Sequence, residues 1–231
     1  MDTLITNVTA VTMTPGTEVL FGVNIGITDG KIEFISKKVP EEMPKTIIEG
    51  TGMVAMPGLI NCHTHLATSV LRCFTDDLTN KEALEALLQK EAKMDSRSAK
   101  AAALLSIAEC LRFGVTSVSD MYDHCDAICE AVAESGIKAN ISRGMTMFLG
   151  DDFDFETFPA CRELVALRDK WQNYDNGRIR IEASVHAEYT STYQLWDALA
   201  EFAINEKLGM QVHLSETKRE HDECVEKYGL T

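Results

Sequence analysis

The chain has 231 residues, and with 45% of them hydrophobic it can bury one large core or two small ones. Its 36 acidic and 22 basic residues give a formal charge of -14, which argues against nucleic acid and membrane surfaces as partners. The first residues carry no leader pattern and no apolar stretch approaches membrane-spanning length, so we expect a cytoplasmic protein. Its 7 cysteines form no C-x-x-C pair and are expected to be reduced thiols.

The first 55 residues alternate apolar and polar positions between turn signals. Residues 4–8, 23–27 and 31–35 are predicted to be short antiparallel strands, and Asp29-Gly30 suits a tight hairpin turn. The prediction for residues 1–55 is an N-terminal β-sandwich segment.

From residue 56 onward the sequence repeats a strand, a loop, an amphipathic helix and a glycine. Such a repeat predicts consecutive right-handed βαβ units in a parallel sheet. The glycines that should end helices are Gly114, Gly136, Gly177 and Gly209, and the predicted strands span residues 54–62, 115–121, 138–147, 178–187 and 210–215.

The polar residues decide between an open doubly wound sheet and a closed barrel. No G-x-G-x-x-G motif follows the first strand, whereas chemically useful side chains follow every strand, as in a (β/α)8 TIM-like barrel. A whole barrel takes about 250 residues, and residues 56–231 hold between five and six units. We therefore predict the first part of such a barrel, apparently truncated after about five βα units.

Two histidines one residue apart end the first barrel strand. In a strand, residues i and i+2 point the same way, so His63 and His65 can face one ion, and His213 at the end of the fifth strand can join them. Three imidazoles suit zinc or ferrous iron, and a metal with an open position activates water near neutral pH. Glu216 follows three residues later, as a proton shuttle or as an ordinary glutamate at a helix start.

Several stretches together resemble the amidohydrolase superfamily, and within it the 5-methylthioadenosine/S-adenosylhomocysteine deaminase branch. They are residues 57–65 (PGLINCHTH), 71–78 (LRCFTDDL), 113–122 (FGVTSVSDMY), 142–144 (SRG) and 212–216 (VHLSE). The resemblance covers essentially the whole chain, and the order of the motifs is more specific than any one of them.

The resemblance implies a role for each matching residue. His63, His65 and His213 match metal ligands, and Glu216 matches the acid that handles the purine ring nitrogen and the leaving amine. It also implies a single divalent metal, with zinc favoured and iron the alternative, because the fourth barrel strand ends without the lysine of two-metal members. The substrate-binding matches are His186, Arg143 for the substrate's tail, and Glu91 for the ribose hydroxyls if one gap is allowed; otherwise Glu91 is a helix-surface residue.

The sequence also departs from the family pattern. The family's fourth histidine, its metal-binding aspartate and a second tail-binding arginine have no counterpart in this chain. The predicted function is a metal-dependent hydrolytic deaminase of adenine nucleosides, with a guanine or cytosine deaminase or a chlorohydrolase as alternatives. An inactive truncated fragment is the third hypothesis. A barrel segment with open edges is expected to form a homo-oligomer or to bind a complementing C-terminal half.

Overall fold

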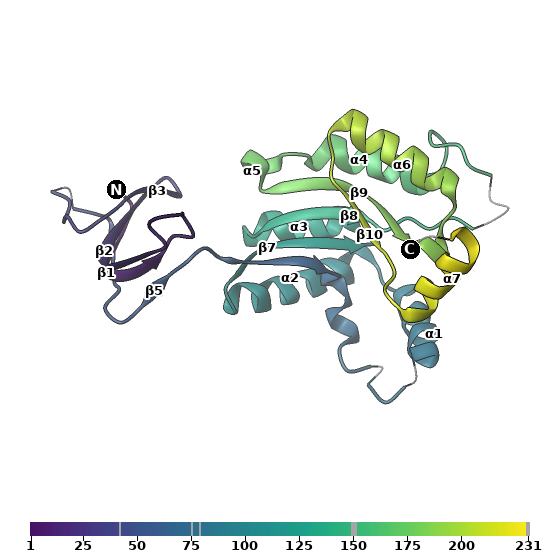
Figure 1. Ribbon diagram of the computed structural model, residues 1–231, viewed down its shortest axis with the longest axis horizontal. Coiled ribbons are helices and arrows are strands. Elements are labelled where there is room, and N and C mark those ends of the chain that lie inside the picture. The colour runs from purple at the N-terminus through teal and green to yellow at the C-terminus, as the bar shows by residue number, and fades with distance from the viewer. Residues whose placement is uncertain (42, 75, 79, 149–151, 230–231) are drawn as a thin grey trace. The chain divides into compact units, whose positions relative to one another are not determined.

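The computed structural model describes residues 1–41, 43–74, 76–78, 80–148 and 152–229 (Figure 1). The chain divides into two compact units, Met1–Gly58 and Leu59–Thr231, each of which is described by itself. None of the helices among these residues is long and apolar enough to cross a membrane.

The first unit is a single mixed sheet. Its strands run in the order β3-β2-β1-β4, and β5 also pairs with β1. The Asp29-Gly30 hairpin is confirmed, because both residues have the positive φ that a tight turn requires, 51° and 70°. The β-sandwich is not confirmed, because β4 and β5 run parallel to β1 and extend the one sheet. The strands are β1 (Thr3–Val11), β2 (Val19–Thr28), β3 (Lys31–Ser36), β4 (Thr46–Glu49) and β5 (Val54–Ala55).

The second unit contains a parallel sheet of five strands in the order β10-β9-β8-β7-β6. These strands follow one another in the sequence, as consecutive βαβ units require. The first predicted strand is wrong in one respect: residues 54–55 pair with β1, and β6 starts only after Pro57 and Gly58. The strands are β6 (Leu59–Thr64), β7 (Val115–Tyr122), β8 (Lys138–Arg143), β9 (Ile179–Ala187) and β10 (Met210–His213).

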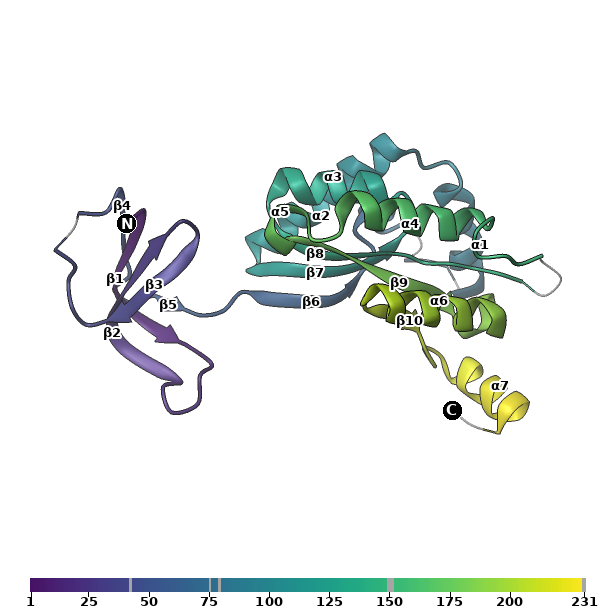
Figure 2. The same cartoon turned by 90° about the horizontal axis from the view of Figure 1, so that it is seen from above.

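The helices α2, α3 and α4 cover one face of this sheet (Figure 2). Their apolar residues and those of the inner strands make the main core, which includes Ile107, Ile128, Leu164, Ile141 and Ile181. The helices are η1 (Leu66–Leu71), α1 (Asn80–Glu91), α2 (Ser96–Arg112), α3 (Cys125–Ser135), α4 (Pro159–Trp171), α5 (Tyr174–Gly177), η2 (Glu188–Thr190), α6 (Tyr193–Glu206) and α7 (Lys218–Tyr228).

One of the four predicted helix-ending glycines has a different role. Gly114, Gly136 and Gly177 adopt positive φ, whereas α6 ends at Lys207, which is itself left-handed. A side chain at Gly209 would bring a Cβ within 2.7 Å of the Glu182 carboxylate. Gly209 therefore makes room for the Glu182 side chain of β9 and does not end the helix.

Candidate metal centre

Three histidines meet at the carboxyl end of the parallel sheet. His63 lies in β6, His65 directly follows it, and His213 ends β10. One ring nitrogen from each lies within 4.8 Å of the others, and the Nε2 atoms of His63 and His213 are 2.9 Å apart. The structure thus brings together residues 150 positions apart in the sequence.

Two main-chain carbonyls orient these rings. Nδ1 of His65 lies 2.5 Å from the carbonyl oxygen of Met121, and Nδ1 of His213 lies 2.8 Å from that of His186. A carbonyl oxygen only accepts hydrogen bonds, so each Nδ1 carries the proton. Both Nε2 atoms therefore present a lone pair, which is how histidine binds a metal ion.

Burial favours the neutral form of two histidines at this site. The pKa of His63 is lowered, first by burial and then by its neighbours His65 and His213. Burial also lowers the pKa of His186. Neutral imidazole is the form that ligates divalent ions, so the three converging nitrogens fit a divalent metal.

A cavity of about 790 Å³ opens beside the histidines. His65, Glu91, Arg143 and His186 all line it, so the structure gathers four of the predicted site residues around one space. Glu91, the last residue of α1, accepts a hydrogen bond of 2.7 Å from the Tyr122 hydroxyl. Glu91 thus lines the cavity, and its contact with a substrate stays a prediction.

Arg143 is already paired within the chain. It forms ion pairs with Asp123 and Glu163, and its Nη1 donates to the carbonyl of Gly144 at 2.8 Å. Two carboxylates therefore face one guanidinium, and the local charge at this end of the cavity is negative.

Glu216 lies on the loop after β10 and does not line this cavity. Its negative charge nevertheless acts on His63, where it opposes the lowering of the pKa by burial. The preceding Ser215 has a positive φ of 49°. Carboxylates hold the loop: Glu188 accepts from the Ser215 amide at 2.9 Å and Glu220 from the Glu216 amide at 3.0 Å.

The sequence interpretation missed Asp120, a fully buried acid in the middle of β7. Its Oδ1 accepts a hydrogen bond of 2.6 Å from the backbone amide of Leu66, and burial raises the pKa of Asp120 to about 7. The signal that would have found it is a single charged residue inside a predicted inner strand, Val115–Tyr122, because such a group is costly to bury without a purpose.

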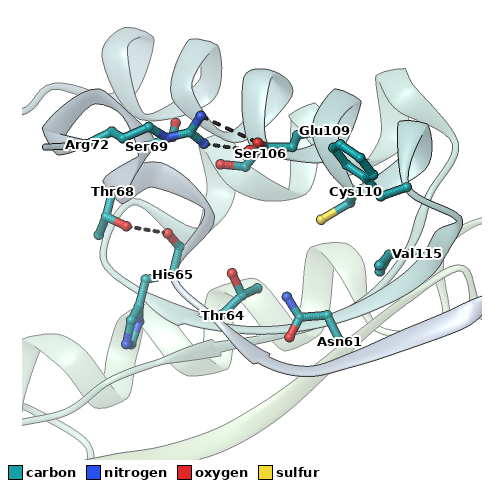
Figure 3. Close-up of a pocket in the computed structure, with 11 residues that line it drawn as sticks. Asn61, Thr64, His65, Thr68, Ser69, Arg72, Ser106, Glu109, Cys110 and Val115 are labelled. Carbon is teal, nitrogen blue, oxygen red and sulfur yellow. Dashed lines mark hydrogen bonds and ion pairs between the residues drawn. The ribbon is translucent and has the colours of Figure 1, made fainter.

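A second cavity, of about 510 Å³, lies on the other side of His65 between β6 and α2 (Figure 3). In it the Thr68 hydroxyl donates to the His65 carbonyl at 2.8 Å, and Arg72 pairs with Glu109. The first contact holds the first turn of η1, and the second ties the end of η1 to α2.

The profile of one protein family matches residues 54–231, and its description is Amidohydrolase family. The chain belongs to the amidohydrolase family. Among its relatives, the 5-methylthioadenosine/S-adenosylhomocysteine deaminase of Dictyoglomus thermophilum is 39% identical over 87% of this chain and 46% of that protein. The enzyme of the same name from Caldicellulosiruptor saccharolyticus is 36% identical over 100% of this chain and 53% of that protein. The chain thus spans about half the length of the curated relatives it matches.

Solved structures share the fold. The atrazine chlorohydrolase of Arthrobacter aurescens, complexed with zinc, superposes with a TM-score of 0.87 at 23% identity, covering 99% of this chain and 56% of that one. An adenosine deaminase from Xanthomonas campestris with bound zinc gives 0.86 at 25% identity, covering 99% and 53%. The predicted partial barrel is confirmed as a curled parallel sheet of five strands, and the zinc in both neighbours supports a divalent metal at the three histidines.

Proposed function

We propose that this chain is the N-terminal portion of a metal-dependent hydrolytic deaminase that converts adenine nucleosides and releases ammonia. The observation that carries the proposal is the convergence of three histidines beside a cavity of about 790 Å³ that Glu91 and His186 also line. Such a volume is typical of sites for small molecules. Relatives named for 5-methylthioadenosine, S-adenosylhomocysteine and 5'-deoxyadenosine support the substrate class.

His63, His65 and His213 would hold one divalent ion, zinc in the first place and iron as the alternative. When bound, such an ion supplies a Lewis acid that lowers the pKa of water and stabilises developing negative charge. The chain's part is to favour the neutral form of His63 through burial, and to orient His65 and His213 through the carbonyls of Met121 and His186.

Glu216 would exchange protons with the purine ring nitrogen and the departing amine. A general acid must reach the reacting atom through a hydrogen bond, which requires its loop to be held in place. The hydrogen bonds from the amides of Ser215 and Glu216 to Glu188 and Glu220 meet that requirement.

Glu91 and Arg143 would contact the sugar and its 5' substituent. The Glu91 carboxylate, beside the Tyr122 hydroxyl, can accept hydrogen bonds from two ribose hydroxyls. Arg143 already faces Asp123 and Glu163, so a further carboxylate on the substrate would meet net negative charge. We therefore propose a preference for uncharged 5' substituents over the homocysteine tail.

The alternatives make different demands on the same cavity. A guanine or cytosine deaminase or a triazine chlorohydrolase binds a free base or ring. Glu91 would then have no ribose hydroxyls from which to accept hydrogen bonds. A chain without activity is expected if residues 1–231 stand alone, because β6 and β10 each pair on one side only within the described residues. The partner would then be a complementing C-terminal half or a second copy of the chain.

The test joins residues 1–231 to the C-terminal remainder of the Dictyoglomus thermophilum relative and measures ammonia release. We expect turnover of 5-methylthioadenosine and 5'-deoxyadenosine, slower turnover of S-adenosylhomocysteine, and none of guanine, cytosine or atrazine. Residues 1–231 alone are expected to release no ammonia. Glu216→Gln and His65→Ala should abolish turnover, and Lys218→Ala, an exposed change beside the same loop, serves as the matched control. Turnover of guanine, cytosine or atrazine in place of the nucleosides would refute the proposal.

A further inference from the structure

Asp120 is an ionisable group buried among core residues. It is 0% exposed, and Oδ2 has no hydrogen-bond partner within the part of the chain that the structure describes. Its other oxygen, Oδ1, makes a short bond of 2.6 Å to the Leu66 amide. Burying a carboxyl group without a cation disfavours folding, so the bond to Leu66 should have a purpose beyond filling space.

The Leu66 amide is a donor that its own helix cannot satisfy. Leu66 is the first residue of η1, and the side chain of His65 at the N-cap makes no capping bond. The first amides of a helix have no intrahelical acceptor, and Leu66 is itself buried. Asp120 supplies the missing cap from the neighbouring strand β7.

Met121, the residue after Asp120, holds the ring of His65, the residue before Leu66. The Met121 carbonyl accepts from Nδ1 of His65, while the Asp120 carboxylate accepts from the Leu66 amide. Two consecutive residues of β7 thus fix the ring and the backbone of His65 together. Parallel pairing, with Thr64 opposite Asp120, sets the register that makes this possible.

Other bonds hold the same turn at its carbonyls. The Thr68 hydroxyl donates to the His65 carbonyl, as Figure 3 shows, and the Ser106 hydroxyl donates to the Leu66 carbonyl at 2.8 Å. Thr68 also bonds the His65 carbonyl through its backbone amide, at 3.0 Å. The amide side of the turn relies on Asp120.

We propose that Asp120 is a positioning residue that fixes the turn after β6 so that Nε2 of His65 points at the metal. This inference rests on the proposed metal site. It assigns to a buried carboxylate the task of orienting a ligand through the main chain, without contact with the ligand's ring. Supporting groups of this kind typically change metal affinity about 10- to 100-fold when they are removed.

The test compares cobalt(II) binding by the 231-residue chain and three variants. Asp120→Leu removes the buried carboxyl, which favours folding, but leaves the buried Leu66 amide without an acceptor, which opposes it. Its urea midpoint is therefore measured beside its affinity. Asp120→Asn keeps an acceptor for the Leu66 amide. Ser142→Ala is the matched control, because Ser142 is equally buried and bonds the Asp120 carbonyl but does not contact residues 65–66.

We expect Asp120→Leu to weaken cobalt binding about 10- to 100-fold, measured by competition with a chromophoric chelator. Its visible cobalt spectrum should be altered, its Leu66 amide less protected from hydrogen exchange, and its loss of cobalt affinity larger than any fall in its urea midpoint accounts for. Asp120→Asn should stay within a few-fold of the parent, and Ser142→Ala should match it. A merely structural role predicts instead that affinity follows the urea midpoint.

Two results would overturn the inference, and they refute different claims. Equal cobalt affinity of the parent and Asp120→Leu, with both folded, would refute the positioning role and leave the metal site standing. Absence of cobalt binding by the parent, or binding that His63→Ala does not weaken, would refute the metal site and the inference together.

Discussion

The inner and the edge strands of the parallel sheet divide the work between them. β7, β8 and β9 are largely buried, with Val118, Ile141 and Ile181 at most 2% exposed. β6 and β10 lie at the two ends of the described sheet, and Ile60 on β6 is 68% exposed. Yet all three candidate ligands lie on or directly after these edge strands.

The difference shows how an exposed ligand can still be held precisely enough to bind metal. Two of the three rings are fixed by the inner strand next to them: the Met121 carbonyl of β7 holds His65, and the His186 carbonyl at β9 holds His213. The well-packed inner strands therefore hold these ligands in a fixed orientation through hydrogen bonds. The stability of the fold should depend on the inner strands. Metal binding should depend on the hydrogen bonds from the inner strands to the edge strands.

The largest expected effect breaks the inner strands. Ile141→Ala removes a fully buried side chain from β8 and should lower the free energy of unfolding by about 2–5 kcal/mol. Ile60→Ala on β6 makes the same chemical change at an exposed position and should cost about 0.5 kcal/mol or less. Urea denaturation measures both. Similar losses at the two positions would mean that β6 is buried in solution against another chain or segment.

The next effect concerns the charge inside β7. Burial raises the pKa of Asp120 from 3.8 to about 7, so between these pH values the folded chain keeps a proton that the unfolded chain has released. Unfolding then releases a proton, and the stability of the folded state should fall as pH rises from 4 to 7 and level off above it. Asp120→Asn cannot ionise and should lack this fall.

Paired urea titrations at pH 4 to 8, with chelator present, measure the effect. The free energy of unfolding of the parent, minus that of Asp120→Asn, should decrease by up to roughly 4 kcal/mol across this range. Histidine titration is common to both proteins and cancels in the difference. A constant difference would show that Asp120 ionises as it does in water.

The sequence predicted the parallel sheet and its histidines because both depend on local patterns. Strands with buried faces read as apolar runs, and parallel strands end at one edge, which brings residues 63 and 213 together without knowledge of the register. The role of Asp120 could not be predicted without that register. Its partner Leu66 follows β6, and only the pairing of β6 with β7 shows that the two residues are neighbours. The sandwich prediction was not confirmed for a similar reason: a short strand does not reveal which sheet it joins, or in which direction.

The smallest expected effect lies where the edge strand β10 leads into α7. Thr217 caps α7 with a reciprocal pair of bonds to Glu220, whereas Thr192, the N-cap of α6, makes no capping bond and donates to the Met147 sulfur instead. Thr217→Ala should therefore cost about 1 kcal/mol of local stability and Thr192→Ala only a few tenths.

Hydrogen exchange of the first amides of α7 and α6 measures this difference. The loss at Thr217 should appear locally and leave the urea midpoint nearly unchanged, because Glu220 is the one buried residue of α7 within the described part of the chain. Elements with little buried apolar surface open independently of the core. A matching fall in the urea midpoint would instead mean that α7 unfolds together with the inner strands, and the division between rigid centre and looser edge would then not extend to the loop that carries Glu216.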